Sequence, residues 1–403
     1  MPPTGDQANE QANEVEALRQ AVREFAEHEV APRVLDYNRR RELPWDLIAQ
    51  MGELGFMGGT VPTEYGGLGL SYLSLVPLVE EMSRIDHVLA ILMAQPSCSV
   101  GASIMLSGTE QQRRRYLPGL AAGTLLAAGA FTEPQSGSHL AGIETTYRVD
   151  GDGYLISGSK VFITLCDHAH VFLTLARDAA DPATITAFLV DRDTPGLSSQ
   201  AIPGTMGLHS IETGFLHLDQ CPVPAGARLG EPGEGLAVAQ RALDRGRLAV
   251  AARCLGMAGY CLDRSVDYAS QRRVGGVAIG DRQLIQAKLA EVALGVETAR
   301  ALVAMLASGI DRGMTRLTYY SSLAKLHASE VAWQAANHAL QIHGGYGYVD
   351  EYHIERYVRD ARMYLIGEGT NEIHQVLVAQ CLLGQRRTDT LPPGEWYRLL
   401  AAQ

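Results

Sequence analysis

The stretch Met363-Tyr-Leu-Ile-Gly-Glu-Gly-Thr-Asn-Glu-Ile-His374 places one carboxylate, Glu368, between Gly367 and Gly369. Glycine allows backbone turns that a Cβ would forbid and lets another group approach closely. Thr370 can cap a helix that starts after it. We therefore predict a glutamate on a tight loop before a helix. A helix N-terminus lowers the pKa of a carboxylate and burial raises it, and a lone loop glutamate is usually a solvated acid.

Composition limits the kind of protein that surrounds this stretch. The chain has 403 residues, of which 46% are hydrophobic and 20% charged, an ordinary soluble composition that predicts two or three domains. The formal net charge of -11 argues against a nucleic-acid partner. No apolar run looks long enough to cross a bilayer, and we expect no signal peptide. Six cysteines without a CxxC pair are typical of a reduced, cytoplasmic protein, and we expect no metal site.

The first half of the chain changes its periodicity once. We predict a loose polar tail over residues 1–13 and an all-helical domain over 14–127, where apolar residues recur at helical spacing. Short strands follow, with the hairpin signal Asp150-Gly-Asp-Gly153 between two of them. Strands at this spacing predict a β-barrel or sandwich domain over 128–235.

The rest of the chain is predicted to be helical again. The long periodic segments are Leu236–Gln271, Arg282–Gly309, Thr315–His343 and Asn371–Leu383. Four such helices are typical of a bundle, which we assign to residues 236–385, with a tail over 386–403. The predicted fold class is thus α+β and multidomain.

Several common catalytic signatures are missing from the sequence. No G-x-G-x-x-G follows a strand, and the segment from Gly153 to Lys160 ends in Gly-Ser-Lys where a P-loop needs Gly-Lys-Ser/Thr. His28-Glu-Val-Ala-Pro32 lacks the second histidine of a zinc helix, and no G-x-S-x-G elbow occurs. Rossmann, P-loop, zinc-protease and serine-hydrolase sites are therefore not expected.

Three other stretches carry unusual patterns. Phe131-Thr-Glu-Pro-Gln-Ser-Gly-Ser-His139 offers hydroxyls and a glycine that could donate hydrogen bonds to a planar ring or a phosphate, or could form a polar connector. The next, Gly158-Ser-Lys-Val-Phe-Ile-Thr164, places Phe162 and Thr164 on one strand face, a pattern that also suits plain core. The third, Gln341-Ile-His-Gly-Gly-Tyr-Gly347, ends a long helix with glycines.

Together these motifs resemble the acyl-CoA dehydrogenase family of flavoproteins. The resemblance rests on T-E-P-x-x-G-S at 132–138, F-I-T at 162–164, Q-x-x-G-G at 341–345 and E-G-T-N-E-I at 368–373. It extends from about residue 14 to about residue 384. Some features, such as Asp350-Glu-Tyr-His-Ile, resemble the glutaryl-CoA dehydrogenase branch. The implied fold has an N-terminal all-α domain, a central β-barrel or sandwich domain and a C-terminal four-helix bundle.

The resemblance implies FAD as the cofactor. The positions that match FAD contacts of the family are Phe131, Thr132, Gly137, Ser138, Phe162, Thr164, Gln341, Gly344, Gly345, Thr370 and Glu372. Arg272 and Gln283 match positions that hold FAD from a neighbouring subunit. A site shared in this way implies an oligomer, expected to be a homotetramer or a homodimer. The expected electron acceptor is an electron-transferring flavoprotein.

The resemblance also assigns the chemistry to Glu368. This residue matches the family's catalytic base, which removes the α-proton of an acyl-CoA while a hydride passes from the β-carbon to flavin N5. Some relatives carry the base on a helix, but Gly246 stands at that position here and has no side chain. The positions that match substrate contacts are Ser138, Asp244, Arg247 and Gly369. Asp244 and Arg247 could equally be a surface ion pair one helical turn apart.

Departures from the family pattern bear on the substrate. Gly129, Phe162 and Gly367 replace larger residues, so we hypothesise a widened site for a branched or bulky acyl group, or for one delivered on a carrier protein. Gly275 replaces an aromatic residue in the turn of the cross-subunit contact. Leu89 lies near the place where glutaryl enzymes have an arginine, so a glutaryl substrate and a decarboxylation are not expected.

Three functions remain in competition. The first is FAD-dependent α,β-dehydrogenation of an acyl-CoA or an acyl-carrier thioester, in fatty acid or amino acid catabolism. The second is a flavin oxidase or monooxygenase on the same fold, against which Glu368 argues because monooxygenase relatives usually lack the glutamate. The third is a non-catalytic scaffold, against which the retained FAD-loop residues argue.

Overall fold

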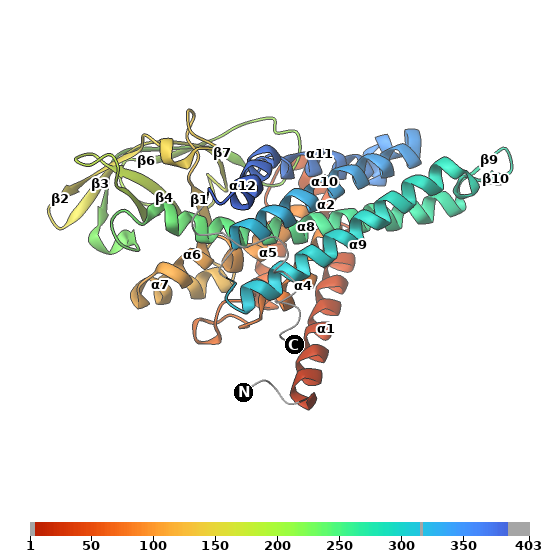
Figure 1. The fold of residues 1–403 in the computed structure, drawn as a ribbon, viewed down its shortest axis with the longest axis horizontal. Helices are drawn as coiled ribbons and strands as arrows, with labels where there is room; N and C mark the ends of the chain where they lie inside the picture. The colour runs from red at the N-terminus through yellow and green to blue at the C-terminus, as the bar shows by residue number, and fades with distance from the viewer. Residues whose placement is uncertain (1–4, 315–316, 386–403) are drawn as a thin grey trace. The chain divides into compact units, whose positions relative to one another are not determined.

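The computed structural model describes residues 5–314 and 317–385, which form two compact units (Figure 1). Unit 1 takes the described residues of 1–36, 71–91 and 247–403, and unit 2 takes 37–70 and 92–246. Three helices contribute residues to both units: α2 (Val34–Arg40), α5 (His87–Cys98) and α8 (Gly235–Gln271). The predicted domain boundaries at 127 and 235 stay a prediction.

Unit 1 is built from helices. They are α1 (Gly5–Phe25), the π-helix η1 (Ala26–Val30), α4 (Tyr72–Ile85), α9 (Gln283–Asp311), α10 (Leu317–His343), α11 (Ile354–Tyr364), α12 (Asn371–Leu382) and the C-terminal part of α8. Helix α10 packs against α9, α11 and α12, and Figure 1 shows α9 and α10 side by side. Alanines at 328, 332, 335, 336 and 339 are almost completely buried along α10, which lets the neighbouring helices approach closely.

Two sequence predictions need correction in unit 1. Residues 5–13 are helical and belong to α1, so the predicted tail is wrong there, because Ala, Gln and Glu favour a helix that continues into the amphipathic part. Helix α11 was not predicted, because its buried Arg356 and Asp360 interrupt the apolar period. The predicted helix start at Thr315 and the tail at 386–403 lie outside the described residues.

Unit 2 is organised around one eight-stranded sheet. The strands are β1 (Ala127–Ala130), β2 (Thr146–Asp150), β3 (Gly153–Thr164), β4 (Val171–Asp178), β5 (Ile185–Asp191), β6 (Leu197–Ala201), β7 (Thr213–Pro224) and β8 (Arg228–Leu229). Their order is β6-β7-β3-β2-β4-β5-β8, and β1 pairs with β4. The predicted hairpin is confirmed, since Asp150 pairs with Gly153 across a turn in which Gly151 has a φ of 60°.

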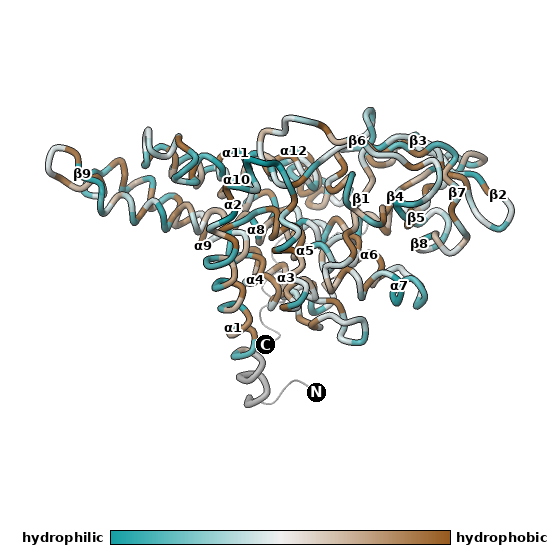
Figure 2. Tube along the Cα trace, turned by 180° about the vertical axis from the view of Figure 1, so that it is seen from behind, coloured by the Kyte–Doolittle hydropathy of each residue, from teal (hydrophilic) through white to brown (hydrophobic). Residues whose placement is uncertain are grey.

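Short helices complete unit 2. They are α3 (Trp45–Glu53), η2 (Thr63–Tyr65), α6 (Val100–Ser107), α7 (Glu110–Ala121), η3 (Leu140–Gly142) and η4 (Ala225–Ala227). One buried cluster joins Leu117 and Leu120 of α7 to Leu173 and Leu175 of β4. The other face of α7 is hydrophilic (Figure 2), and a capping box between Thr109 and Gln112 starts the helix. The predicted outward charges of this segment are confirmed.

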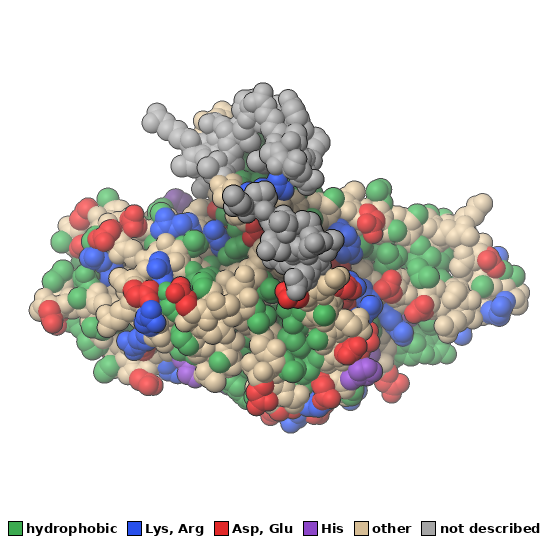
Figure 3. Space-filling view, turned by 90° about the horizontal axis from the view of Figure 1, so that it is seen from below, with side chains coloured by type: hydrophobic (Ala, Val, Ile, Leu, Met, Phe, Trp, Pro, Cys, Tyr) green, Lys and Arg blue, Asp and Glu red, His purple; other side chains and the backbone are tan. Residues whose placement is uncertain are grey.

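One segment is more apolar than the sequence interpretation allowed. The stretch His87–Ser107, which covers α5 and α6, is long and apolar enough to cross a membrane by length and composition, and 83% of its apolar window is buried in the protein. Burial of this kind is typical of a core helix. On the face shown in Figure 3, acidic and basic side chains are interspersed.

Candidate active site

Glu368 lies in a strained loop of unit 1 between α11 and α12. Its φ is 57°, in the left-handed region that a residue with a Cβ rarely adopts, and Gly369 follows with a φ of 93°. The Thr370 side chain caps α12 by accepting a hydrogen bond of 3.3 Å from the Ile373 N–H. A left-handed non-glycine residue costs about 1 kcal/mol or more, and such strain concentrates at functional sites. The predicted loop geometry is confirmed.

The carboxylate of Glu368 has an unusual environment. Its Oε2 atom is buried and has no hydrogen-bond partner among the described residues. Burial raises the pKa of Glu368 above its ordinary value of 4.5, and the nearby charges of Arg253, Arg247 and Lys325 oppose this rise without cancelling it. Of the two effects that the sequence left open, burial therefore dominates. A carboxylate with a raised pKa is a stronger proton acceptor than a solvated one.

The expected effect of the helix start falls on a different residue. The pKa of Glu372, in the first turn of α12, is lowered because its carboxylate accepts hydrogen bonds from its own backbone N–H and from Thr370. Glu372 is exposed and thus acts as a helix-start acid. Glu368, four residues earlier, does not share this role.

A buried lysine holds the backbone on the C-terminal side of Glu368. Lys325 of α10 is fully buried and donates hydrogen bonds of 2.7 Å to the Gly369 carbonyl and of 2.8 Å to Asn371 Oδ1. Ser329 also donates to Asn371 Oδ1, and Asn371 Nδ2 donates to Glu330. Burial lowers the pKa of Lys325 to about 8. The role of Lys325 in supporting the loop was not predicted from the sequence.

A buried histidine supports the same loop from α12. His374 Nε2 lies 3.1 Å from the Glu368 carbonyl, and because a carbonyl only accepts, Nε2 carries the proton. Burial lowers the pKa of His374 to about 3, so the ring is neutral at physiological pH. Lys325 and His374 therefore fix the loop backbone and leave the Glu368 side chain without a hydrogen bond at Oε2.

In unit 2, a buried ion pair shapes the 131–139 loop. Glu133 Oε1 lies 2.7 Å from Lys160 Nζ, and the backbone N–H groups of Glu144 and Thr145 donate to the same carboxylate. Burial alone would raise the pKa of Glu133, but the charge and hydrogen bond of Lys160 outweigh it and the pKa falls to about 2. Glu133 and Lys160 were not predicted as site-forming residues.

The anchored loop presents its other polar groups outward. Gly137 and Ser138 are exposed, and Phe131 and Thr132 are partly exposed. Since Glu133 holds the loop from inside, these groups remain available for a ligand, as the first of the two sequence interpretations requires.

Phe162 of β3 is placed unusually for a phenylalanine. Its φ is 58°, it is 66% exposed, and it lies where the register of β3 against β7 shifts between Lys160 and Ile163. Such a bulge redirects a side chain. Thr164, two residues on, is partly exposed, whereas Ile163 is buried, so the predicted shared face is confirmed. An exposed aromatic ring on a strained bulge fits a planar ligand better than it fits a core.

A third group of residues predicted to contact FAD belongs to unit 1 and is distant in sequence from the Glu368 loop. The guanidinium of Arg272 lies over the ring of Tyr346, 5.4 Å from its centroid, so Arg272 is beside the Gln341–Gly347 turn. Gln283, Gln341, Gly344 and Gly345 are all exposed. Gly275, which replaces an aromatic residue, and Gly276 have φ values of 64° and 81° in the two-residue turn between β9 (Arg273–Val274) and β10 (Val277–Ala278).

The predicted substrate pair on α8 is buried. Asp244 is 5% and Arg247 4% exposed, so the alternative of a surface ion pair is wrong. Asp244 accepts a hydrogen bond of 3.0 Å from Gln240. Arg247 lies close enough to Glu368 to affect its pKa.

Two of the glycines behind the hypothesis of a widened site have side chains beside them. A Cβ on Gly367 would lie 2.6 Å from Met363 Sδ, near the end of a flexible side chain, and one on Gly129 would lie 3.4 Å from the Phe131 ring, an ordinary van der Waals contact. The bulky acyl group stays a hypothesis.

The residues of unit 2 fit FAD on their own geometry. The exposed Phe162 ring and the exposed Gly137–Ser138 backbone with the Ser138 hydroxyl offer stacking and hydrogen-bond partners for a planar ring and a phosphate. In unit 1, the Arg272 guanidinium is a separate group that could contact a phosphate. Within residues 5–314 and 317–385, no group of three or more His, Cys, Asp or Glu side chains could hold a metal ion.

Family models match nearly the whole chain. Residues 12–124 match the acyl-CoA dehydrogenase N-terminal domain, residues 128–221 its middle domain and residues 233–383 its C-terminal domain. An acyl-CoA dehydrogenase of Bacillus subtilis is 40% identical over 91% of this chain and 97% of its own length. A subunit of the caffeyl-CoA reductase-Etf complex of Acetobacterium woodii is 37% identical over 91% and 97% of the two chains.

Solved structures agree with these relatives. A glutaryl-CoA dehydrogenase bound to glutaryl-CoA superposes with a TM-score of 0.89 at 32% identity, covering 93% of this chain and 96% of that one. A prolyl acyl carrier protein oxidase gives 0.88 at 31% identity, with 92% and 98% covered. An acyl-CoA dehydrogenase of Bacillus anthracis complexed with FAD gives 0.87 at 33% identity, with 94% and 70% covered. The predicted fold class is confirmed, and the chain belongs to the acyl-CoA dehydrogenase family of oxidoreductases.

Proposed function

We propose that this chain catalyses the FAD-dependent α,β-dehydrogenation of an acyl thioester, with Glu368 as the base that removes the α-proton. The observation that carries the proposal is the state of Glu368. It lies on a left-handed backbone, its Oε2 is buried without a partner among the described residues, and burial raises its pKa. A structural carboxylate would be hydrogen-bonded, as buried charges normally are.

The chain's own residues supply position and electrostatics for this reaction. When bound, FAD accepts the hydride that leaves the β-carbon. Phe131, Thr132, Gly137, Ser138, Phe162 and Thr164 would hold the cofactor. Glu368 takes the α-proton, and its backbone N–H donates to the thioester oxygen as negative charge develops there. Lys325 and His374 keep that backbone in place.

Anaerobic bleaching of the flavin absorbance by acyl-CoA tests the proposal. Glu368→Gln should retain FAD and lose bleaching by a factor on the order of 1,000, since general bases contribute about 100- to 10,000-fold. Glu297→Gln, an exposed glutamate on α9, is the control and should bleach like the wild type. Wild-type rates in Glu368→Gln would exclude this residue as the base.

One comparison favours a second candidate, oxidation of a carrier-bound acyl group with oxygen as acceptor. The prolyl acyl carrier protein oxidase among the structural neighbours motivates it. The test is the rate at which the reduced flavin reoxidises in air, measured with acyl-CoA and with the same acyl group on a carrier protein. Rapid reoxidation with the carrier substrate alone would favour the oxidase over the dehydrogenase.

An electron-transferring flavoprotein is the acceptor that we propose for the dehydrogenase. The relative that belongs to an Etf complex supports this proposal. Purified electron-transferring flavoprotein should sustain turnover that oxygen alone does not. We also propose a cytoplasmic location, which six buried cysteines without a CxxC pair support.

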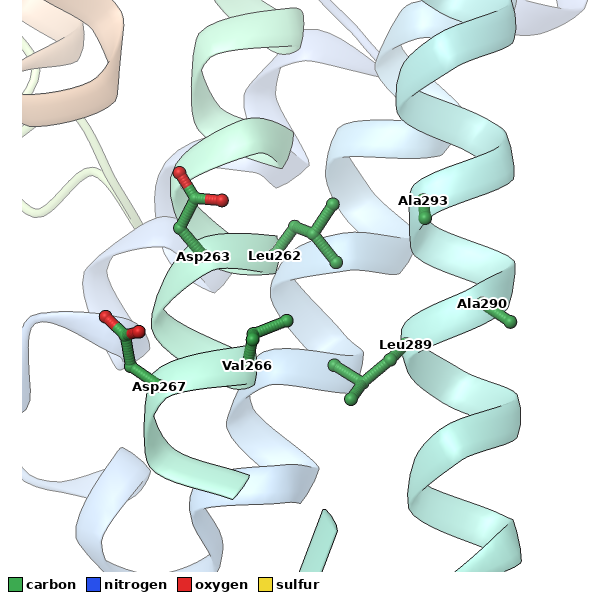
Figure 4. A pocket seen from close by; sticks show the side chains of 7 residues that line it. All are labelled: Leu262, Asp263, Val266, Asp267, Leu289, Ala290 and Ala293. Atoms are coloured by element: carbon green, nitrogen blue, oxygen red, sulfur yellow. The ribbon is translucent and has the colours of Figure 1, made fainter. Parts of the chain in front are cut away.

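We further propose a homotetramer or homodimer. A surface groove of about 630 Å³ between α8 and α9 is lined mostly by apolar side chains (Figure 4). In Figure 4, Leu262, Val266 and Leu289 point into the space between the helices, whereas Asp263 and Asp267 lie on the other side of α8. Leu284 and Leu294 of α9 are 80% and 66% exposed. Exposed apolar side chains of this kind support self-association, which sedimentation would test.

A further inference from the structure

A buried arginine of α8 has no function in the account so far. Arg253 is 7% exposed, and its neighbours on the helix, Ala252 and Cys254, are almost fully buried. Its guanidinium lies over the ring of Tyr364, 5.4 Å from the centroid. Within the described part of the chain, the Arg253 side chain makes no hydrogen bond and no ion pair, and Nε is buried without a partner.

An unpaired guanidinium in a protein interior is costly. It has five N–H donors and is always charged, and the ring of Tyr364 interacts only with its face. Removal of such a charge from water costs several kcal/mol unless an acceptor compensates it. A buried polar group without a partner is rare in proteins, and a ligand that supplies the partner is one explanation for it. The donors of Arg253 therefore indicate an acceptor that arrives with a ligand.

A second unsatisfied donor lies beside the first. The hydroxyl of Tyr364 is buried and has no hydrogen-bond partner in the described chain. Its ring is the one that Arg253 covers, so the two donor groups share one neighbourhood of unit 1. Burial keeps this hydroxyl protonated by raising its pKa, so it can donate. One carboxylate can accept from both groups, because it has two oxygens with about four lone-pair positions.

The neighbourhood is also that of Glu368. Arg253 is the charge with the largest effect on the Glu368 carboxylate, ahead of Arg247 and Lys325. Two acids near Tyr364 already have other partners, since Asp360 bonds to His87 at 2.7 Å and Asp86 pairs with Arg356 at 3.6 Å. Neither forms a hydrogen bond with Arg253 Nε, so this donor remains for another acceptor.

We propose that Arg253, with the Tyr364 hydroxyl, forms a carboxylate-binding subsite for the acyl group, so that the preferred substrates are thioesters whose acyl chain ends in a carboxylate. This inference rests on the proposed function and names its substrate class. The comparison at position 89, where Leu89 replaces an arginine, argued against such a substrate. Arg253 supplies the guanidinium from a different helix. The bulky-acyl hypothesis is then not needed.

Matched pairs of substrates test the proposal. The FAD-loaded enzyme is assayed with butyryl-, hexanoyl- and octanoyl-CoA and with succinyl-, adipoyl- and suberoyl-CoA, which have the same chain lengths and a terminal carboxylate. For at least one acyl-chain length, the wild-type kcat/KM should be at least 10-fold higher for the thioester with the terminal carboxylate than for the uncharged thioester. Arg253→Gln should lower that ratio on the order of 10- to 100-fold, and Arg253→Lys should restore part of it, since a charge-assisted hydrogen bond is lost and then replaced.

Controls separate this role from others. Arg264→Gln removes a guanidinium from an exposed position of the same helix and should keep the wild-type ratio. FAD absorbance and the thermal midpoint report whether each variant is folded. If Arg253 only adjusts the pKa of Glu368, Arg253→Gln will change both members of a pair equally, and that result overturns the proposal.

The remaining outcomes distinguish failure of the carboxylate subsite from failure of the proposed dehydrogenation. Bleaching by the uncharged thioesters, with no preference for a carboxylate at any length, overturns the subsite and leaves the proposed dehydrogenation standing. Failure of every thioester to bleach the flavin overturns the proposed function, and the subsite with it. A preference for the carboxylated member that disappears in Arg253→Gln supports both.

Discussion

Two glutamates, the buried Glu133 in unit 2 and Glu368 in unit 1, whose Oε2 atom is buried, show how one type of side chain serves opposite purposes. Each has a buried lysine near it, and burial lowers the pKa of both lysines to about 8. Lys160 donates directly to Glu133. Lys325 instead donates to the backbone carbonyl of Gly369 and to Asn371, and leaves Glu368 Oε2 without a hydrogen bond.

The difference in hydrogen bonding sets the proton affinity of the two acids. The pKa of Glu133 falls to about 2, whereas that of Glu368 is raised above 4.5. A carboxylate whose lone pairs are satisfied stays ionised and holds a loop. A carboxylate whose oxygen is buried and unbonded is available to accept a proton from a ligand. The lesson is that burial alone does not make a base, because the partners decide.

Removal of the Glu133 carboxylate should have the largest effect on stability. Glu133→Gln leaves the Lys160 ammonium buried without its counter-charge, so we expect a loss of about 3–5 kcal/mol in unfolding free energy, with weaker FAD binding from the 131–139 loop. Denaturant unfolding of the FAD-loaded enzyme measures this. Glu144→Gln, at an exposed neighbouring position, should stay near wild type. A Glu133→Gln protein as stable as the wild type would remove the structural half of the comparison.

The unfolding free energy at acidic pH should also report the ion pair of Glu133 and Lys160. Because the folded-state pKa of Glu133, about 2, lies below the ordinary 4.5, the unfolded chain binds a proton in this window that the folded chain does not. The contribution, on the order of 3 kcal/mol, is complete above pH 4.5 and is lost as the pH falls toward 2. Unfolding free energies of wild type and Glu133→Gln between pH 6 and pH 3 should converge. Parallel curves would contradict the assignment.

Loss of the Lys325 hydrogen bonds that hold the Glu368 loop should have the next-largest effect on stability. Lys325→Met removes two hydrogen bonds and one positive charge near Glu368, so we expect a loss of about 1–3 kcal/mol in stability. The pKa of Glu368 should rise further, because the Lys325 charge lowers it. Thermal unfolding and the pH dependence of kcat/KM measure the two effects. Lys288→Met on α9 is the control, and an unshifted pH profile in Lys325→Met would argue for a purely structural lysine.

The smallest effect on stability is expected at the proposed base itself. Because Glu368 Oε2 has no partner, Glu368→Gln removes a buried charge without breaking a hydrogen bond there. The unfolding free energy at neutral pH should stay the same or rise by up to about 1 kcal/mol. Its thermal midpoint, compared with that of Glu133→Gln, tests the contrast directly. A large loss of stability in Glu368→Gln would mean that this carboxylate also has a structural role.

Only some of the residues around Glu368 and in the flavin loops could be predicted from the sequence. The glycines beside Glu368, the Thr370 cap and the two flavin-loop motifs could be recognised, since they depend on residues close together in the chain. Lys325 and Arg253 could not, because each is a single charge within an apolar helical run and meets Glu368 only through tertiary packing. The closeness of Met363 to Gly367 was also hidden, because it depends on the Met363 rotamer.

The acid limb of the pH profile of kcat/KM tests the central claim most directly, because it reports the pKa of the essential base in the free enzyme. If Glu368 is the base, kcat/KM for acyl-CoA should fall as the pH is lowered, with a pKa clearly above the ordinary 4.5. This pKa should move upward in Lys325→Met, because the Lys325 charge lowers it. An acid limb with a pKa at or below 4.5 would contradict the assignment of Glu368, whose Oε2 is buried without a hydrogen bond among the described residues, as the base.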